Sequence, residues 1–168
     1  FVSKKAFNIK GLGSKIIDRL VDEHLVSQPA DIFELTEGDL LPLERFAEKA
    51  AAKLISAIQS SKQVALACFI YALGIRHVGE EIARDLAQHF GSIDSLEKAT
   101  KEQLQVIPNI GTKVSESVYQ WFQSNQHRKL IKDLLKAGGV KILPPENPLA
   151  GGGKLRGLTL VITGALAS

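Results

Sequence analysis

Several kinds of residue are scarce in this 168-residue chain, and each scarcity excludes a class of structure or site. The one cysteine, Cys68, can form neither an intrachain disulfide nor a cysteine zinc site, so we interpret it as a small core residue in a reducing compartment. Aromatic residues make up 6% of the chain, too few for a platform on which single-stranded bases stack. The longest apolar run, residues 64–73, is too short to span a bilayer. Methionine is absent, even at position 1, which predicts a piece of a longer protein.

The formal net charge of +3 is small, but it is unevenly distributed. Residues 1–30 and 101–141 carry net charges of +2 and +4, whereas residues 31–62 and 63–100 each carry −2. Basic regions are typical of proteins that contact nucleic acid, but randomly scattered surface charge gives a similar distribution. Charge alone therefore leaves both interpretations open.

A five-residue pattern occurs four times and is the most informative feature of the sequence. Each copy has an apolar residue, two turn residues, a second apolar residue and a small residue, and each precedes an amphipathic stretch. The copies, which we number hairpins one to four, are residues 9–13, 43–47, 75–79 and 107–111. Their starts lie 34, 32 and 32 residues apart, which indicates an internal repeat.

The glycines of this pattern indicate phosphate binding. Glycine in the turn permits a positive φ, and glycine at the end lets the backbone approach a ligand without a Cβ in the way. The helix that follows presents unpaired N–H groups and the positive end of its dipole. This is the helix-hairpin-helix pattern, and four copies predict a protein that holds the DNA backbone without reading its sequence.

The apolar periodicity predicts an all-α fold through residue 140, without strands. Helices are predicted over 14–24, 48–60, 64–73, 80–89, 112–122 and 126–137, with a short helix after Pro29 and a stop at Gly138. Thr36 with Asp39, and Thr100 with Gln103, stand at the spacing of a capping box. A shift of 64 residues superposes these two pairs, so we predict that the hairpins form two duplicated pairs.

The composition changes after residue 142. Residues 143–153 hold three prolines and three glycines, which predicts a flexible linker over 143–154 behind a helix-hairpin-helix domain over 1–142. Residues 155–164 are apolar and β-branched and are predicted to be the only strand of the chain. One strand cannot form a sheet, so residues 155–168 are interpreted as the start of a truncated second domain.

The order of these segments resembles bacterial NAD-dependent DNA ligases. The resemblance is carried by residues 1–17, 43–54, 71–83, 107–114 and 155–166, and ALGIRHVGEE at 72–81 is its most specific string. It covers the helix-hairpin-helix domain of that family and the first strand of its C-terminal BRCT domain. The family's zinc finger, OB-fold and adenylation domains would precede this segment, and the Lys-x-Asp-Gly motif of the adenylated lysine is not in this sequence.

The resemblance implies an enzyme that seals nicks in DNA during replication, repair and recombination. This segment would grip double-stranded DNA across the minor groove, as part of a bacterial cytoplasmic, nucleoid-associated monomer whose other domains are its partners. NAD, magnesium and zinc are implied for the full-length enzyme, whereas we predict no catalytic residue, metal or cofactor in this fragment. Two alternatives stay open, a DNA-binding module of a repair nuclease or junction-binding protein, and a helical protein-interaction domain.

The four hairpins differ in how much of the phosphate cradle they keep. The candidate DNA-binding residues are Gly11, Gly13, Ser14 and Lys15 in hairpin one, Arg76, His77 and Gly79 in hairpin three, and Asn109, Gly111, Thr112 and Lys113 in hairpin four. Hairpin two has lost both glycines to Arg45 and Ala47, so Arg45 and Lys49 are weaker candidates and a packing role is open as well.

Other charged residues near the hairpins are interpreted differently. Glu80 and Glu81 complement the helix dipole but are expected to repel a phosphate at hairpin three. The basic run at residues 127–129 is predicted to be a solvated helix face, and the neighbouring Trp121 and Phe122 are predicted to be buried.

Overall fold

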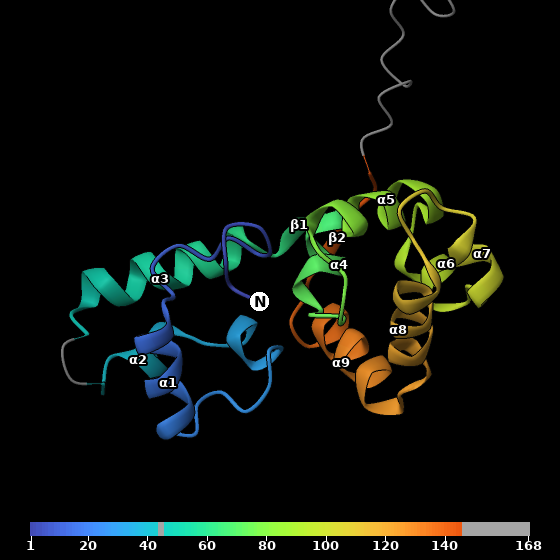
Figure 1. The fold of residues 1–168 in the computed structure, drawn as a ribbon. Coiled ribbons are helices and arrows are strands. Elements are labelled where there is room, and N and C mark those ends of the chain that lie inside the picture. Colours follow the sequence, from blue (N-terminus) through green and yellow to red (C-terminus); the bar gives the residue numbers. More distant parts are fainter. Residues whose placement is uncertain (44–45, 146–168) are drawn as a thin grey trace, which may run out of the picture.

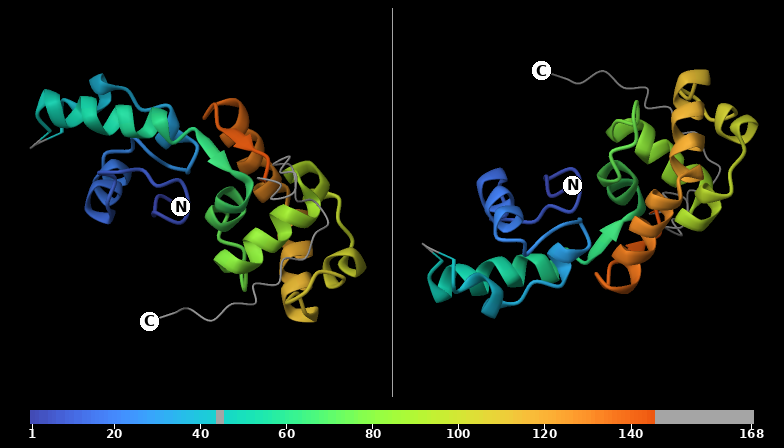
Figure 2. Two further views of the ribbon diagram at one scale, coloured as in Figure 1. Left: turned by 90° about the horizontal axis from the view of Figure 1, so that it is seen from above. Right: turned by 90° about the horizontal axis from the view of Figure 1, so that it is seen from below.

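The computed structural model describes residues 1–43 and 46–145, which form two helical lobes (Figure 1). The N-terminal lobe contains α1 (Ser14–Asp22), the short 3-10 helix η1 (Asp31–Phe33), α2 (Glu37–Leu40) and α3 (Glu48–Ser60). The C-terminal lobe contains α4 (Leu66–Ala72), α5 (Glu80–Phe90), α6 (Ile93–Glu97), α7 (Lys101–Gln105), α8 (Thr112–Gln123) and α9 (Asn125–Lys136). Both views of Figure 2 place the N-terminal segment between the lobes. The predicted helical fold is confirmed.

A short parallel sheet corrects the prediction that no strand precedes residue 140. Strand β1 (Gln63–Ala65) pairs with β2 (Lys141–Leu143), with Val64 opposite Ile142. Val64 is buried. Next to the sheet, the Lys141 N–H donates to the Lys62 carbonyl at 2.7 Å, which extends the pairing of the two strands by one residue. A three-residue strand is too short to show an alternating pattern, so neither strand gave a signal in the sequence. The strand predicted over 155–164 and nearly all of the linker lie outside the described residues.

Two predicted helix ends also shift. α1 ends at Asp22 rather than His24, because His24 has a φ of 58° and the N–H groups of Leu25 and Val26 turn back to the Leu20 carbonyl. The helix predicted over 64–73 begins at Leu66, since the residues before it belong to β1.

The end of α9 uses two glycines for different reasons. α9 stops before Gly138 as predicted, and the left-handed residue is the next one, Gly139, with a φ of 63°. A Cβ on Gly138 would lie 2.7 Å from the Leu134 carbonyl oxygen, so Gly138 is required by close backbone approach. The Val140 N–H then donates to the same carbonyl at 3.0 Å, which closes the helix end and leads the chain into β2.

Both predicted capping boxes are present. The Thr36 N–H donates to Asp39 Oδ2 at 2.8 Å, and the Thr100 N–H donates to Gln103 Oε1 at 2.9 Å. The boxes begin α2 and α7, the helices that lead into hairpins two and four. Their common geometry agrees with the predicted duplication of a hairpin pair.

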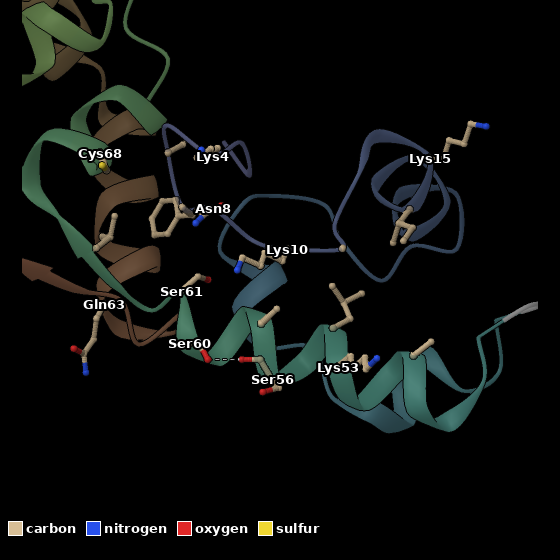
Figure 3. Close-up of a pocket in the computed structure, with 18 of the residues that line it drawn as sticks. Lys4, Asn8, Lys10, Lys15, Lys53, Ser56, Ser60, Ser61, Gln63 and Cys68 are labelled. Carbon is tan, nitrogen blue, oxygen red and sulfur yellow. Dashed lines mark hydrogen bonds between the residues drawn. The ribbon is translucent and has the colours of Figure 1, made fainter.

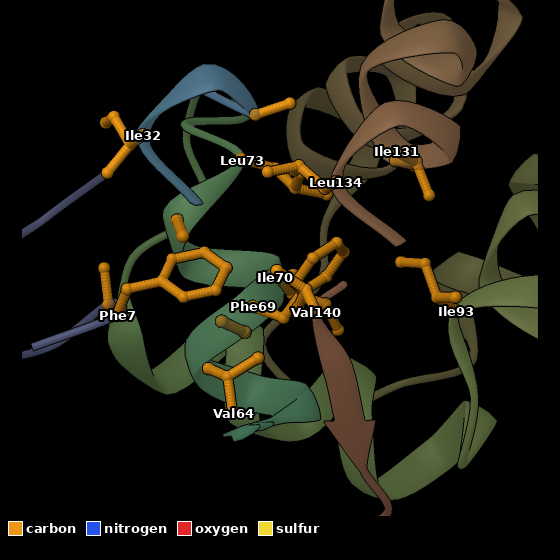
Figure 4. Close-up of a cluster of buried hydrophobic side chains, with 14 of the residues drawn as sticks. Phe7, Ile32, Val64, Phe69, Ile70, Leu73, Ile93, Ile131, Leu134 and Val140 are labelled. Carbon is orange, nitrogen blue, oxygen red and sulfur yellow. The ribbon is translucent and has the colours of Figure 1, made fainter. Parts of the chain in front are cut away.

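One cluster of buried apolar side chains extends through both lobes (Figure 4). Phe7 of the N-terminal segment connects the two parts of this cluster. Its ring centroid lies 5.1 Å from that of Phe33 in η1 and 6.1 Å from that of Phe69 in α4. Phe122 is buried as predicted, whereas Trp121 is only partly buried. The shared core gives the lobes a fixed relative position, which matters for the hairpins that they carry.

Candidate nucleic-acid interface

The four hairpins share one backbone turn. In each, the N–H of the fourth residue donates to the carbonyl of the first, at 3.3 Å for Leu12 to Ile9, 3.1 Å for Phe46 to Leu43, 3.0 Å for Val78 to Ile75 and 3.1 Å for Ile110 to Ile107. The first residue is buried in every copy, and the fourth is buried or half-buried. The apolar pair therefore anchors the turn in the core, and in hairpins one, three and four the two residues between them are exposed.

The third residue of the turn adopts a left-handed conformation wherever the structure describes it. Its φ is 86° at Gly11, 66° at His77 and 68° at Asn109. Glycine has no Cβ to resist this conformation, and asparagine and histidine adopt it more readily than most residues. The sequence prediction of a positive φ in the turn is thus confirmed, and Arg45, the corresponding residue of hairpin two, lies outside the described residues.

The last residue of each hairpin has ordinary extended backbone and is the N-cap of the next helix. Its φ is −86° at Gly13, −78° at Ala47, −85° at Gly79 and −83° at Gly111. An added Cβ at any of the three glycines would meet no atom within 4 Å among the described residues. The fold itself therefore does not require glycine there, and the space in front of the helix is open.

The hairpin helices α1, α3, α5 and α8 begin without a side-chain cap, because glycine and alanine have no acceptor to offer. Three other helices, α6, α7 and α9, have Ser92, Thr100 and Ser124 as N-caps. The hydroxyl of each accepts a hydrogen bond from an N–H group of the first turn. The third residue of α1, α3 and α8 already donates its N–H to the N-cap carbonyl. The N–H groups of the first two residues of the hairpin helices are thus available to an external acceptor, and the helix dipole favours an anionic one.

The side chains predicted to assist these amides are exposed. Lys15, Lys49 and Lys113 occupy the second position of α1, α3 and α8, whereas α5 has Glu81 at that position. Ser14 and Thr112 are the first residues of their helices. Arg76 and His77 are exposed on the turn of hairpin three, and Asn109 on that of hairpin four.

Sequence reasoning missed Lys10. It is exposed and occupies the position in hairpin one that Arg76 occupies in hairpin three. The motif alignment alone contained this signal, since both residues follow the first apolar residue of their copy.

Glu80 is less repulsive to an anion than the sequence suggested. Its carboxylate Oε2 lies 2.9 Å from Nζ of Lys5, and Oε1 lies 3.5 Å from a guanidinium nitrogen of Arg84. The hydrogen bond from Lys5 is the main cause that lowers the pKa of the Glu80 carboxyl. The charge of Glu80 is therefore offset by two cations, whereas the exposed Glu81 beside it has no ion pair among the described residues.

The basic run at residues 127–129 is not a uniformly solvated face, so that prediction was wrong for two of its residues. The His127 ring stacks on Trp121 with centroids 4.3 Å apart, and its Nδ1 lies 2.9 Å from the Trp121 carbonyl oxygen. Arg128 Nε donates to the Phe122 carbonyl at 2.6 Å. Cationic side chains suit the unpaired carbonyls at the end of α8, so only Lys129 remains fully exposed.

The comparisons with known proteins agree with this geometry. Residues 4–60 match the family described as "SAM-like Helix-hairpin-helix tandem", and residues 68–131 match the one described as "Helix-hairpin-helix motif". A DNA ligase of Desulforudis audaxviator (strain MP104C) is 46% identical over 166 residues, which is 99% of this chain.

The chain is homologous to a segment of a DNA ligase. It spans 25% of the length of that ligase. The two helix-hairpin-helix matches coincide with the two lobes, so each lobe of this DNA ligase homologue carries one hairpin pair. The resemblance to a DNA ligase and the helix-hairpin-helix motifs inferred from the sequence are thereby confirmed.

Proposed function

We propose that this chain is the part of a bacterial NAD-dependent DNA ligase that holds nicked duplex DNA by its sugar-phosphate backbone, on the minor-groove side. The observation that carries this proposal is the open space in front of Gly13, Gly79 and Gly111. These residues have an extended backbone and no packing constraint among the described residues, so an external group can approach the backbone closely at each of them.

Each hairpin would hold one phosphate group. The first-turn N–H groups donate to phosphate oxygens, and Lys15, Lys113 and Arg76 add positive charge beside them. Phosphates repeat along any duplex, so this grip would be independent of base sequence. That independence suits an enzyme that must act on nicks wherever they occur.

The chemistry of ligation would belong to other domains of the same enzyme, which would be the partners of this chain besides DNA. The sequence has no Lys-x-Asp-Gly motif and a single cysteine, so its residues do not fit an adenylation site or a four-cysteine zinc site. Among the described residues no group of three or more histidine, cysteine or acidic side chains is arranged to hold a metal. NAD, magnesium and zinc are therefore assigned to the full-length enzyme, and this fragment alone would be non-catalytic.

Replication, repair and recombination are the processes in which such an enzyme would act, as a monomer in the bacterial cytoplasm and nucleoid. Within the described part of the chain, no helix combines the length and apolar character that a membrane span requires. A module of a repair nuclease or junction-binding protein is the second candidate, and the 46% identity to a DNA ligase over 99% of the chain favours the first. A pure protein-interaction role would leave the uncapped helices unexplained.

A salt titration tests the proposal. Two nicked duplexes of equal length and unrelated sequence should bind with equal affinity. If hairpins one, three and four each neutralise one phosphate, the slope of log K against log salt should be about −3. Lys15→Gln should reduce this slope by about 0.9, and Lys132→Gln on α9 should leave it unchanged. A strong preference for one sequence, or an affinity that does not depend on salt, would refute backbone binding.

A further inference from the structure

A large groove lies beside α3 in the N-terminal lobe, with a volume of about 1160 Å³. Its walls come from the N-terminal segment, hairpin one, α1, α3 and the start of α4, and we call it the α3 groove (Figure 3). Small-molecule sites have volumes of about 300–1,000 Å³, so this space suits a segment of a polymer better than a metabolite.

The rim of the α3 groove is cationic. Lys4, Lys10, Lys15, Arg19 and Lys53 line it, and no carboxylate is among the described residues that do so. None of the four lysines forms an ion pair within the described part of the chain. Figure 3 shows Lys10 beside α3, Lys53 on α3 and Lys4 on the N-terminal segment, whereas Lys15 projects from α1 away from α3. Their charges add in one concave surface and would attract an anionic occupant.

The floor of the α3 groove is apolar and has helical spacing. Ala50, Leu54 and Ala57 follow one another at intervals of three or four residues along α3, and Phe46 of hairpin two and Ile16 of α1 line the same space. A stripe of this kind is the surface against which an amphipathic helix packs its own apolar residues. The α3 groove is therefore complementary to an occupant that is apolar on one side and acidic on the other.

We propose that the α3 groove binds an acidic amphipathic helix of a protein partner. The backbone of duplex DNA would satisfy the lysines but matches the apolar floor poorly, because charged phosphates interrupt the small apolar surfaces of its sugars. Single-stranded bases need exposed aromatic faces, whereas Phe7 is buried and Phe46 is half-buried. Residues 146–168 of this chain carry one carboxylate, Glu146, and two cations, so their charge does not fit this role. This surface shares Lys10 and Lys15 with hairpin one, whereas its apolar floor is additional to the phosphate contacts of the hairpins.

The test uses the full chain and a fluorescent synthetic helix of about four turns, with leucines on one face and glutamates on the other. A second peptide has the same composition, rearranged so that no apolar face forms. Fluorescence anisotropy should show binding of the first peptide and at least about tenfold weaker binding of the second. Lys53→Glu should weaken binding of the first peptide by at least about tenfold, whereas Lys132→Glu, the same charge change on α9, should not.

Ala50→Gln tests the floor without changing the charge. Ala50 is exposed, so the variant should fold, which circular dichroism verifies, and it should bind the amphipathic peptide severalfold more weakly. Equal binding of both peptides would mean that the groove attracts negative charge without recognising a helix, and would overturn the proposal. Tighter binding of a single-stranded oligonucleotide, with the same sensitivity to Ala50→Gln, would instead assign the groove to nucleic acid. Self-association of the chain that Lys53→Glu abolishes, without peptide binding, would assign it to a second copy.

Discussion

Lys5 and Glu80 connect the N-terminal segment to the candidate DNA interface, with Nζ 2.9 Å from Oε2. Glu80 is the first residue of α5 and directly follows Gly79, so its carboxylate stands beside the first-turn amides of hairpin three. Lys5 precedes Phe7, whose ring packs near Phe33 and Phe69 of the two lobes. The ion pair therefore compensates an unfavourable charge at a point that the shared core holds in place.

Lys5→Ala should weaken duplex binding even though Lys5 belongs to no hairpin, because it leaves the Glu80 charge less compensated near the phosphate. Combining it with Glu80→Gln should restore most of the affinity. Fluorescence titration of a nicked duplex with the single and double variants measures both effects. If the double variant binds as weakly as Lys5→Ala, Lys5 contacts DNA directly.

The ion pair between Lys5 and Glu80 should also depend on pH. Because the pKa of the Glu80 carboxyl is lowered, the ion pair is fully present at any pH above the ordinary pKa of a glutamate and is lost as the pH falls through the lowered pKa.

Valine at the N-cap position of three hairpins should rank these hairpins by their contribution to DNA affinity. Gly13→Val and Gly111→Val place a branched side chain between the helix start and the phosphate, and each should cost about 1–3 kcal/mol of binding free energy. Ala47→Val only enlarges an existing methyl group and should cost much less. Titration of a nicked duplex measures the three affinities.

In the structure, the effect of these valine substitutions on binding can be separated from an effect on folding. Because Gly13 and Gly111 have extended backbone and open space around the missing Cβ, valine should leave the fold intact at both positions. Thermal unfolding of each variant provides the control. Equal binding losses at all three positions would show that hairpin two grips DNA as firmly as the others.

Replacement by alanine should lower the stability of the protein at Gly11 but not at Gly13. Gly11 has a φ of 86°, which an L-residue adopts at a cost of about 1–2 kcal/mol, whereas Gly13 has a φ of −86° that alanine adopts freely. Urea unfolding should therefore show a loss of that size for Gly11→Ala and little change for Gly13→Ala. A large destabilisation by Gly13→Ala would mean that the N-cap packs against something in the folded chain.

The two capping boxes should differ in their response to pH. The Thr36 hydroxyl and N–H both donate to Asp39 Oδ2, at 2.7 and 2.8 Å, and these bonds lower the pKa of the Asp39 carboxyl. Asp39→Ala should cost about 0.5–1.5 kcal/mol of unfolding free energy at neutral pH. A carboxyl with a lowered pKa contributes its stability above its ordinary pKa and loses it as the pH falls through the lowered one, so this cost should shrink below about pH 4.

Gln103 is the matched control, since it occupies the equivalent position in the second box and does not titrate. Gln103→Ala should have a similar cost that stays constant between about pH 7 and pH 3. Urea unfolding of both variants across this range measures the difference. A parallel pH dependence of the two would assign the effect to other carboxyls of the protein.

The sequence by itself determined the features that depend on near neighbours. The four hairpin turns, the starts of the helices after them and both capping boxes follow from interactions three or four residues apart, so glycine, threonine and apolar spacing were sufficient signals. The same local rules predicted the left-handed residue at Gly11. The candidate phosphate contacts could be proposed from sequence for this reason.

Only the tertiary structure decided the features that join distant segments. The pairing of β1 with β2, the contact of Lys5 with Glu80 and the gathering of Lys4, Lys10, Lys15 and Lys53 around one groove have no local signature. They arise because burial of a core shared by both lobes brings these segments together, and the gain from burying apolar surface does not depend on separation along the chain. The sequence therefore determined the hairpins, and the packing of the two lobes decided which charges stand beside them.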